Sequence, residues 1–178
     1  MVSCTRFAVV VAAVTLLTSP ASAAPIRYNC DSGAGYFSEI EQFQAGPDYR
    51  VQGSFEANLI RSHPKYLPTA TIAFESKDKS THIGVQLMKR HNKKLYDATI
   101  VAKIGGERKV WSVTAVDLNT AVLFSLKVSK SGTATATLAG RTIEVPVSIG
   151  PDGRLSITCS TGGFEFHGLD WTAQEVKQ

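Results

Sequence analysis

The chain has 178 residues, of which 43% are hydrophobic and 19% are charged, and its formal net charge is +4. This length fits one domain with a continuous core. The longest apolar run, residues 7–17, is shorter than the roughly 20 residues that cross a bilayer, which excludes a membrane-spanning helix.

The N-terminus has the pattern of an export signal. A basic stretch ends at Arg6, the apolar run follows, and an Ala-x-Ala cleavage site ends at Ala23. We expect residues 1–23 to be a signal peptide and residues 24–178 to form a single secreted or periplasmic domain.

Cleavage would also remove Cys4, which precedes the apolar run and is badly placed to carry a lipid anchor. Two cysteines then remain, Cys30 near the start and Cys159 near the end. Because disulfides persist outside the cytoplasm, we predict a bond between them that ties the ends of the domain together.

Apolar residues recur with period two over most of the remaining chain, which predicts an all-β protein. The segments with this alternation are 49–59, 70–74, 83–87, 95–102, 110–116, 122–128, 143–149 and 155–159. Residues 37–44 fit either a helical turn or a strand. Short turns rich in Gly, Ser, Asp and Lys separate the segments, so we expect a mainly antiparallel sheet. Pro146 lacks an N–H, which predicts an edge or a bulge there.

Several segments resemble strands of the concanavalin A-like jelly rolls, the laminin G and lectin/glucanase group. The resemblance rests on segments 49–55, 70–74, 124–128 and 133–138 and on the closing stretch 162–171. It implies an antiparallel β-sandwich of jelly-roll type, in which the last strand pairs near the first. That pairing would bring Cys30 and Cys159 together.

Glucanases of that group carry two catalytic glutamates as Glu-x-Asp-x-Glu, and this chain has no such segment. The nearest pair, Glu39 and Glu41, is better interpreted as solvated carboxylates. Polysaccharide lyases of the same shape use Arg, Gln, His and Tyr. Arg50, His82 and Gln86 are of these types and point outward on their strands, as ordinary solvent-facing residues would.

The four histidines are scattered, without the spacing of a zinc site, and no calcium loop or nucleophile elbow is present. We therefore predict no metal and no cofactor. Chelator treatment that lowered the melting temperature would contradict the prediction that the protein has no metal.

Positive charge is concentrated in residues 77–109, which hold nine basic and three acidic side chains. Arg90, Lys93 and Lys94 belong to this segment, and we expect its hairpin turns to gather at one end of the sandwich, where a polyanion could bind. The alternative is that lysine-rich turns only keep the sheet soluble. Nucleic acid is excluded as a partner by export and by the lack of interleaved aromatic residues.

Aromatic side chains are the other candidate ligand-binding groups, because a sugar ring can stack on them. Tyr66 lies in a loop between two prolines and is expected to be exposed. Trp111 is a second candidate, although Trp111 and Trp171 also suit the core.

Together these features predict a secreted or periplasmic protein that binds an extracellular glycan without catalysis. The candidate residues are Tyr66, His82, Gln86, Arg90, Lys93, Lys94 and Trp111. Two alternatives stay open: a polysaccharide hydrolase or lyase, and an envelope protein that binds another protein. The oligomeric state does not follow from the sequence.

Overall fold

The computed structural model describes residues 26–45, 48–90 and 93–173, and this part of the chain is all-β, as predicted. It contains no helix that could cross a membrane. The strands are β1 (Ile26–Gln44), β2 (Tyr49–Ile60), β3 (Thr69–Glu75), β4 (His82–Lys89), β5 (Tyr96–Ile104), β6 (Glu107–Val116), β7 (Val122–Val128), β8 (Thr133–Leu138), β9 (Arg141–Pro146) and β10 (Arg154–Ala173).

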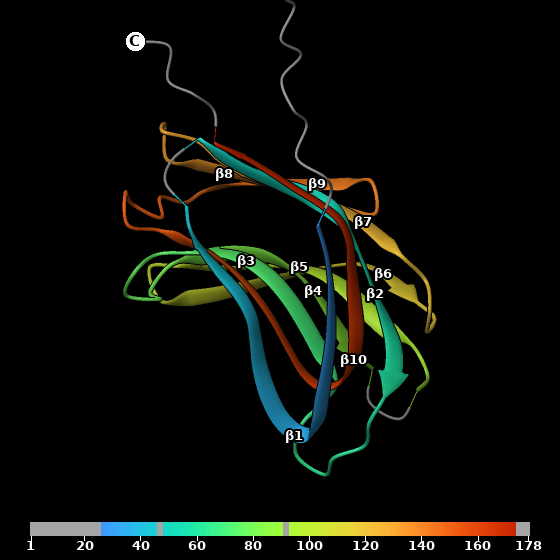
Figure 1. Cartoon of the computed structure of the whole chain (residues 1–178). Helices are drawn as coiled ribbons and strands as arrows, with labels where there is room; N and C mark the ends of the chain where they lie inside the picture. Colours follow the sequence, from blue (N-terminus) through green and yellow to red (C-terminus); the bar gives the residue numbers. More distant parts are fainter. Residues whose placement is uncertain (1–25, 46–47, 91–92, 174–178) are drawn as a thin grey trace, which may run out of the picture.

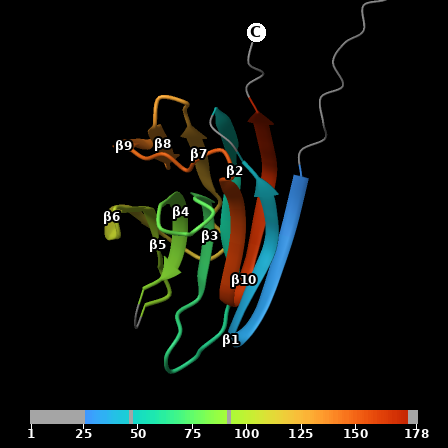
Figure 2. The same cartoon turned by 90° about the vertical axis from the view of Figure 1, so that its left-hand side faces the viewer.

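All pairings are antiparallel, in the order β6-β5-β4-β3-β10-β2-β7-β8-β9, with β1 added alongside β10. The first part of β10, residues 154–160, pairs with β3, and the second part, residues 162–173, pairs with β2. One strand therefore belongs to two layers. Figures 1 and 2 show these layers, with β3 to β6 in one and β2 and β7 to β9 in the other. This is the predicted jelly-roll sandwich.

Strands β1 and β10 run together along both layers and make a common U-shaped bend, at the bottom of Figure 1. At this bend Thr161 and Gly35 have positive φ angles, 56° and 81°, and the Gly35 N–H donates to the Thr161 hydroxyl at 3.3 Å. Residues 37–44 are part of β1, so the strand interpretation of this segment is the right one.

The core lies between the two layers and is built from the inward side chains of alternating strands. Phe55 stacks on Phe166 and meets Phe124 edge to face, so β2, β10 and β7 share one aromatic cluster. Leu59 departs from the inward pattern predicted for residues 49–59 and is 42% exposed. Pro146 ends β9, the last strand of its layer, which confirms the predicted edge.

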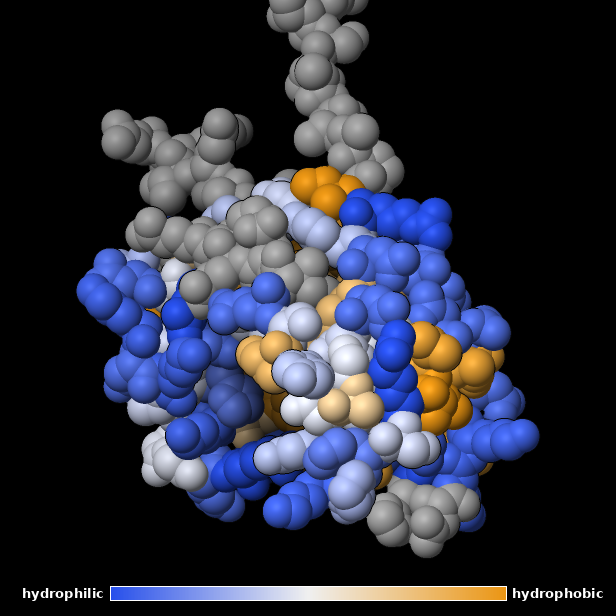
Figure 3. All heavy atoms as spheres, turned by 60° about the horizontal axis from the view of Figure 1, so that its bottom comes forward, coloured by the Kyte–Doolittle hydropathy of each residue, from blue (hydrophilic) through white to orange (hydrophobic). Residues whose placement is uncertain are grey.

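The outer surface is mainly hydrophilic, with a paler area in the view from the bend (Figure 3). In the described part of the chain, the large hydrophobic side chains that stay exposed are Tyr36, Phe37, Leu59, Tyr66, Val110 and Leu123. The three aromatic residues among them belong to the bend of β1 and to the loop between β2 and β3.

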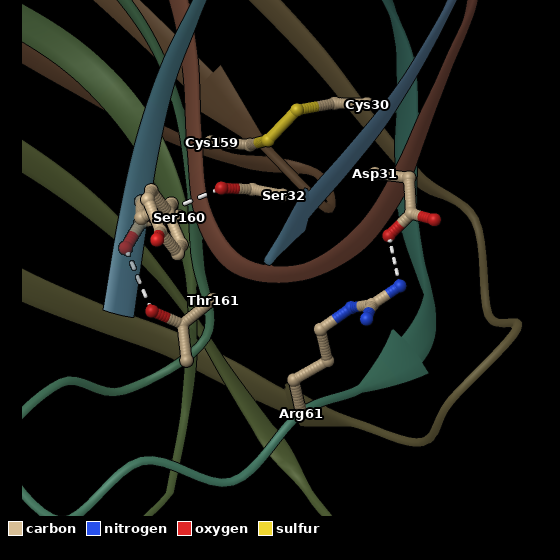
Figure 4. The surroundings of a disulfide bond; sticks show 8 residues. Cys30, Asp31, Ser32, Arg61, Cys159, Ser160 and Thr161 are labelled. Carbon is tan, nitrogen blue, oxygen red and sulfur yellow. Dashed lines mark hydrogen bonds and ion pairs between the residues drawn. A yellow bond between two sulfur atoms is a disulfide. The ribbon is translucent and has the colours of Figure 1, made fainter. Parts of the chain in front are cut away.

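The disulfide joins Cys30 to Cys159, as predicted, with a Cα–Cα distance of 6.5 Å (Figure 4). Cys30 pairs across to Phe164 in one arm of the bend, and Cys159 pairs across to Ser38 in the other arm. The bond therefore connects the two layers inside the bend. Beside it the Arg61 guanidinium donates to the Asp31 carboxylate at 2.5 Å, which attaches the start of the loop after β2 to the same arm of β1.

Replacing both cysteines by alanine should lower the free energy of unfolding. The two residues are 129 positions apart, and a loop of this size corresponds to about 4–5 kcal/mol in the chain-entropy model. Urea unfolding of the oxidised protein and the double variant measures the difference. Reduction of the unsubstituted protein should reproduce the loss, and a difference below about 1 kcal/mol would contradict the role we assign to the bond.

Tyr96 is fully buried against Phe164, and its hydroxyl has no hydrogen-bond partner among the described residues. Burial raises the pKa of Tyr96 from 10.0 to about 12. The neutral phenol is thus favoured in the folded state, and its contribution to stability is complete below pH 10 and is lost as the pH rises towards 12.

We expect Tyr96→Phe to leave the unfolding free energy at pH 7 unchanged or to raise it by about 1 kcal/mol, because it removes an unpaired buried hydroxyl. The variant should also lose less stability than the original protein between pH 10 and 12. Denaturant unfolding across this range tests both points, with Tyr66→Phe at an exposed tyrosine as the control. Identical alkaline profiles for the original protein and the Tyr96 variant would refute the assignment.

Candidate functional site

A shallow hollow of about 280 Å³ lies on the outer face of the layer formed by β3 to β6, and we call it the polar hollow. Its lining comes from β1, β3, β4, β5, β6 and β10. The lining residues are Phe37, Thr71, Ala73, Glu75, His82, Gln86, Val101, Arg108 and Thr158. Two of the sequence-predicted residues, His82 and Gln86, thus share one site.

The strand register arranges these side chains in three rows across the sheet. The first row carries charge and an imidazole, the middle row is small and apolar except for Ser156 at its β10 end, and the third row carries hydroxyls and an amide. The rows are Arg154, Glu75, His82, Lys103 and Arg108; Ser156, Ala73, Gly84, Val101 and Val110; and Thr158, Thr71, Gln86, Thr99 and Ser112.

The middle row forms the floor of the hollow because its side chains are short. Ala73 and Val101 are buried, and Gly84 between them has no side chain. A Cβ at position 84 would lie 2.5 Å from the Ile72 carbonyl oxygen, so glycine is required there. Polar rows on both sides of a small apolar floor suit a flat molecule that presents hydroxyls and carboxylates at its edges and C–H groups on its face.

The charged row keeps a net positive charge after the ion pair between Arg154 and Glu75 is taken into account. Glu75 accepts from Arg154 Nε at 3.3 Å and from the Ser156 hydroxyl at 2.9 Å. Lys103 and Arg108 have no carboxylate partner among the described residues, and the Lys103 ammonium donates to the Lys79 carbonyl oxygen at 3.5 Å. Arg108 is exposed at the rim, so its guanidinium is available to a carboxylate, which it can bind through two parallel hydrogen bonds.

His82 lies between these charges and is half-buried. Burial is the largest cause of its lowered pKa, and the positive charges of Lys103 and Arg108 lower it further, whereas Glu75 opposes them. The ring is therefore neutral at pH 7. Gln86, two positions along the same face from Gly84, donates from its amide to the Thr71 hydroxyl at 3.1 Å, which fixes its orientation.

Two other residues considered from the sequence lie elsewhere. Trp111 stands opposite Ile100 and packs against the core, so it faces away from the hollow. Arg50 is in β2, in the opposite layer, where it stands across from Lys127 of β7. Neither can act together with His82 on one small ligand.

The basic turns do not gather at one end, contrary to the expectation for residues 77–109. Successive turns of an antiparallel meander fall at opposite ends of the sheet, so the β3–β4 and β5–β6 turns lie at one end and the β4–β5 turn at the other. Lys103 and Arg108 belong to the first end. Lys93 and Lys94, both exposed, belong to the second.

Arg90 and Tyr66 also lie at the second end. The Arg90 guanidinium donates from Nε to both carboxylate oxygens of Asp97, at 3.1 and 3.2 Å, and is thereby neutralised. Tyr66 is 54% exposed and stacks on His63 in the loop between β2 and β3. This loop lies beside the end of β4, because the Lys89 N–H donates to the Pro68 carbonyl at 2.8 Å.

A separate cluster lies on the outer face of the other layer, where Glu56, Glu165 and His167 place one possible metal ligand each within 4.8 Å of the others. Their charges are already balanced in part: Glu165 pairs with Arg27 and accepts from Asn58 at 3.0 Å. These contacts lower the pKa of the Glu165 carboxyl, the Arg27 hydrogen bond most strongly. The expectation that the protein needs no metal stays a prediction.

Sequence reasoning missed the partners of His82 within the hollow. Glu75, Thr71 and Arg108 come from the neighbouring strands, and only the pairing register shows that they lie beside His82 and Gln86. The available clue was the four-residue spacing of His82 and Gln86 in one strand, which places both on the same face.

The comparisons with known proteins concern the fold. No protein-family model matches the chain, and no curated protein matches it in sequence. The fold is that of the concanavalin A-like jelly rolls. Similar solved structures include an alginate lyase from Alteromonas sp. 272, at 9% identity and a TM-score of 0.60 over 86% of this chain and 89% of that one.

Two further structures have the same architecture. An alginate lyase from Pseudomonas aeruginosa matches at 12% identity with a TM-score of 0.52, over 72% of this chain, which spans 65% of that enzyme's length. Scytalido-glutamic peptidase matches at 12% identity with a TM-score of 0.57, over 78% of this chain and 80% of that one. At such identities the likeness shows the fold alone, which is shared by a lyase and a peptidase.

Proposed function

We propose that this chain is an extracellular or periplasmic protein whose polar hollow binds an anionic polysaccharide. The observation that carries the proposal is the row arrangement of the hollow: two cations without a carboxylate partner along one side, hydroxyl and amide groups along the other, and a floor of small residues between them. A polysaccharide that contains uronic acids offers the complementary groups. Alginate, the substrate named for two of the structural neighbours, is the first such polymer to try.

Charge favours an anionic ligand over a neutral one. Lys103 and Arg108 have no carboxylate partner in the described structure, whereas Glu75 already accepts from Arg154 and Ser156. A uronate carboxylate at Arg108 would form a charge-assisted hydrogen bond, which is stronger than a hydrogen bond between neutral groups. The hydroxyls of Thr71 and Thr158 and the amide of Gln86 would contact sugar hydroxyls on the other side.

A lyase is the second candidate, and the neutral ring of His82 is the observation that favours it. In a β-elimination a base removes the proton next to the uronate carboxylate, the glycosidic C–O bond breaks, a C=C bond forms and the leaving oxygen takes a proton. A neutral imidazole beside Arg108 could be that base. The residues that line the hollow include no tyrosine to return the proton, and we therefore place binding first.

Replacing Lys103 and Arg108 together by alanine should weaken alginate binding at least about tenfold, because hydrogen bonds to charged groups contribute about 1.5–3 kcal/mol each. Isothermal titration of residues 24–178 measures the affinity. The matched control is Arg50→Ala with Lys127→Ala, which removes the same charges from the outer face of the other layer. Equal weakening in both double variants would mean that only net charge matters and would count against the hollow.

The affinity for alginate should rise as the pH falls below 6.5, because the lowered pKa of His82 means that the ring gains its proton only below the ordinary histidine value of 6.5. His82→Gln should remove this rise while it keeps a polar side chain. The same titrations can be followed by ultraviolet absorbance for an unsaturated product. A product that forms with the original protein and not with His82→Gln would replace the binding proposal by the lyase.

A further inference from the structure

The U-shaped bend and the loop between β2 and β3 expose aromatic rings beside the polar hollow. Tyr36 is 72% exposed, Phe37 67% and Tyr66 54%. Exposed aromatic side chains that gather in one region of a soluble protein commonly mark a binding surface. Together with His63, we call these residues the aromatic platform. The bend and this loop lie at the bottom of Figure 1, on the side that Figure 3 brings forward.

The ring of Tyr66 is held in place rather than free. It stacks on His63 with a centroid distance of 4.9 Å and an interplanar angle of 26°. His63 also lies against β1, since a Cβ at Gly35 would lie 2.9 Å from the His63 Nε2 atom. The Lys65 N–H donates to His63 Nδ1 at 3.2 Å. A ring fixed in this way loses little conformational freedom when a ligand covers it.

A second hollow of about 170 Å³ adjoins Tyr66, and its wall is basic. It is lined by Arg61, Ser62, His63, Tyr66, Leu67, Pro68 and Lys89. Arg61 is paired with Asp31, whereas Lys89 has no ion-pair partner among the residues that the structure describes. The combination of an open ring and an unpaired ammonium fits a sugar that carries a carboxylate.

The aromatic platform is continuous with the polar hollow. Phe37 lines the hollow and lies two residues along β1 from Gly35, which is in close contact with His63 of the platform. Pro68 of the second hollow and Thr71 of the polar hollow are three residues apart on the way into β3, which corresponds to about 10 Å of extended chain. One linear polymer can therefore contact both places.

We propose that the aromatic platform is a second subsite for the same anionic polysaccharide, where a sugar ring stacks on Tyr66 while its carboxylate faces Lys89. This inference rests on the proposed function of the polar hollow. The inference also gives the orientation of the bound polysaccharide. Its sugars run from Arg108 at one end of the sheet, past Phe37, to Tyr66 at the other end. Specificity for longer oligosaccharides follows from this geometry.

The test compares alginate oligosaccharides of two and six residues by isothermal titration with residues 24–178. Tyr66→Ala should weaken binding of the hexamer about tenfold, the range expected for loss of a ring contact together with its buried area, and should leave binding of the dimer unchanged. Tyr66→Phe keeps the ring and should bind the hexamer like the original protein. Circular dichroism and the melting temperature check that the variants fold.

Each failure has its own pattern. If Tyr66→Ala binds the hexamer normally while the Lys103 and Arg108 double variant does not, the platform is not a subsite and the proposal for the polar hollow stands. If Tyr66→Phe is as weak as Tyr66→Ala, the phenol hydroxyl and not stacking is responsible, and the inference fails in its stated form. If the original protein binds neither oligosaccharide, the proposed function fails and the platform proposal with it.

Discussion

The pairing of β10 with three different strands is the constraint on which the rest of the structure depends. Residues 154–160 pair with β3 and residues 162–173 pair with β2, and β1 follows β10 through both parts. A shift of one residue in this ladder would turn the inward side chains of both layers outward. The disulfide connects the two arms of the same bend, so it stabilises the strand pair that sets the register of both layers.

The register also determines what the outer face presents. The core, which includes Phe55, Phe124 and Phe166, fills the space between the layers. The outward side chains do not have to fit into this space. The residue types at these outward positions can therefore be suited to a ligand without disturbing the core. The charged row and the hydroxyl row of the polar hollow are each composed of residues from five strands and lie outside the core between the layers.

The sequence predicted those features of the fold that depend on the residue pattern within a single strand. Period-two alternation predicted the strands, Cys30 and Cys159 were predicted to form the disulfide, and Pro146 indicated an edge. The continuity of β10 was not predicted, because residues 155–159 and 162–171 were interpreted as two separate strands. The structure places Gly162 and Gly163 beside Asn58 and Leu59 of β2, where a side chain would collide.

The site was predicted less well than the fold, because it depends on relations between strands. His82 and Gln86 share a face by spacing alone, but Glu75 and Arg108 join them only through the pairing register. The turns of residues 77–109 were expected together although alternate hairpin turns of a meander point in opposite directions. Trp111 was a candidate because a strand pattern gives two faces without saying which one is the core.

Two different forces operate along the proposed binding surface. Attraction by Lys103 and Arg108 acts over about 8 Å at physiological ionic strength and weakens as salt is added. Stacking on Tyr66 requires contact and removes water from an apolar face, so salt does not weaken it in the same way. Cations alone would hold any polyanion, and an exposed ring alone would hold many flat molecules weakly. A polymer that satisfies both must combine negative charge with sugar rings at a spacing matched to the sheet, and this joint requirement is the physical basis for selecting a long acidic polysaccharide.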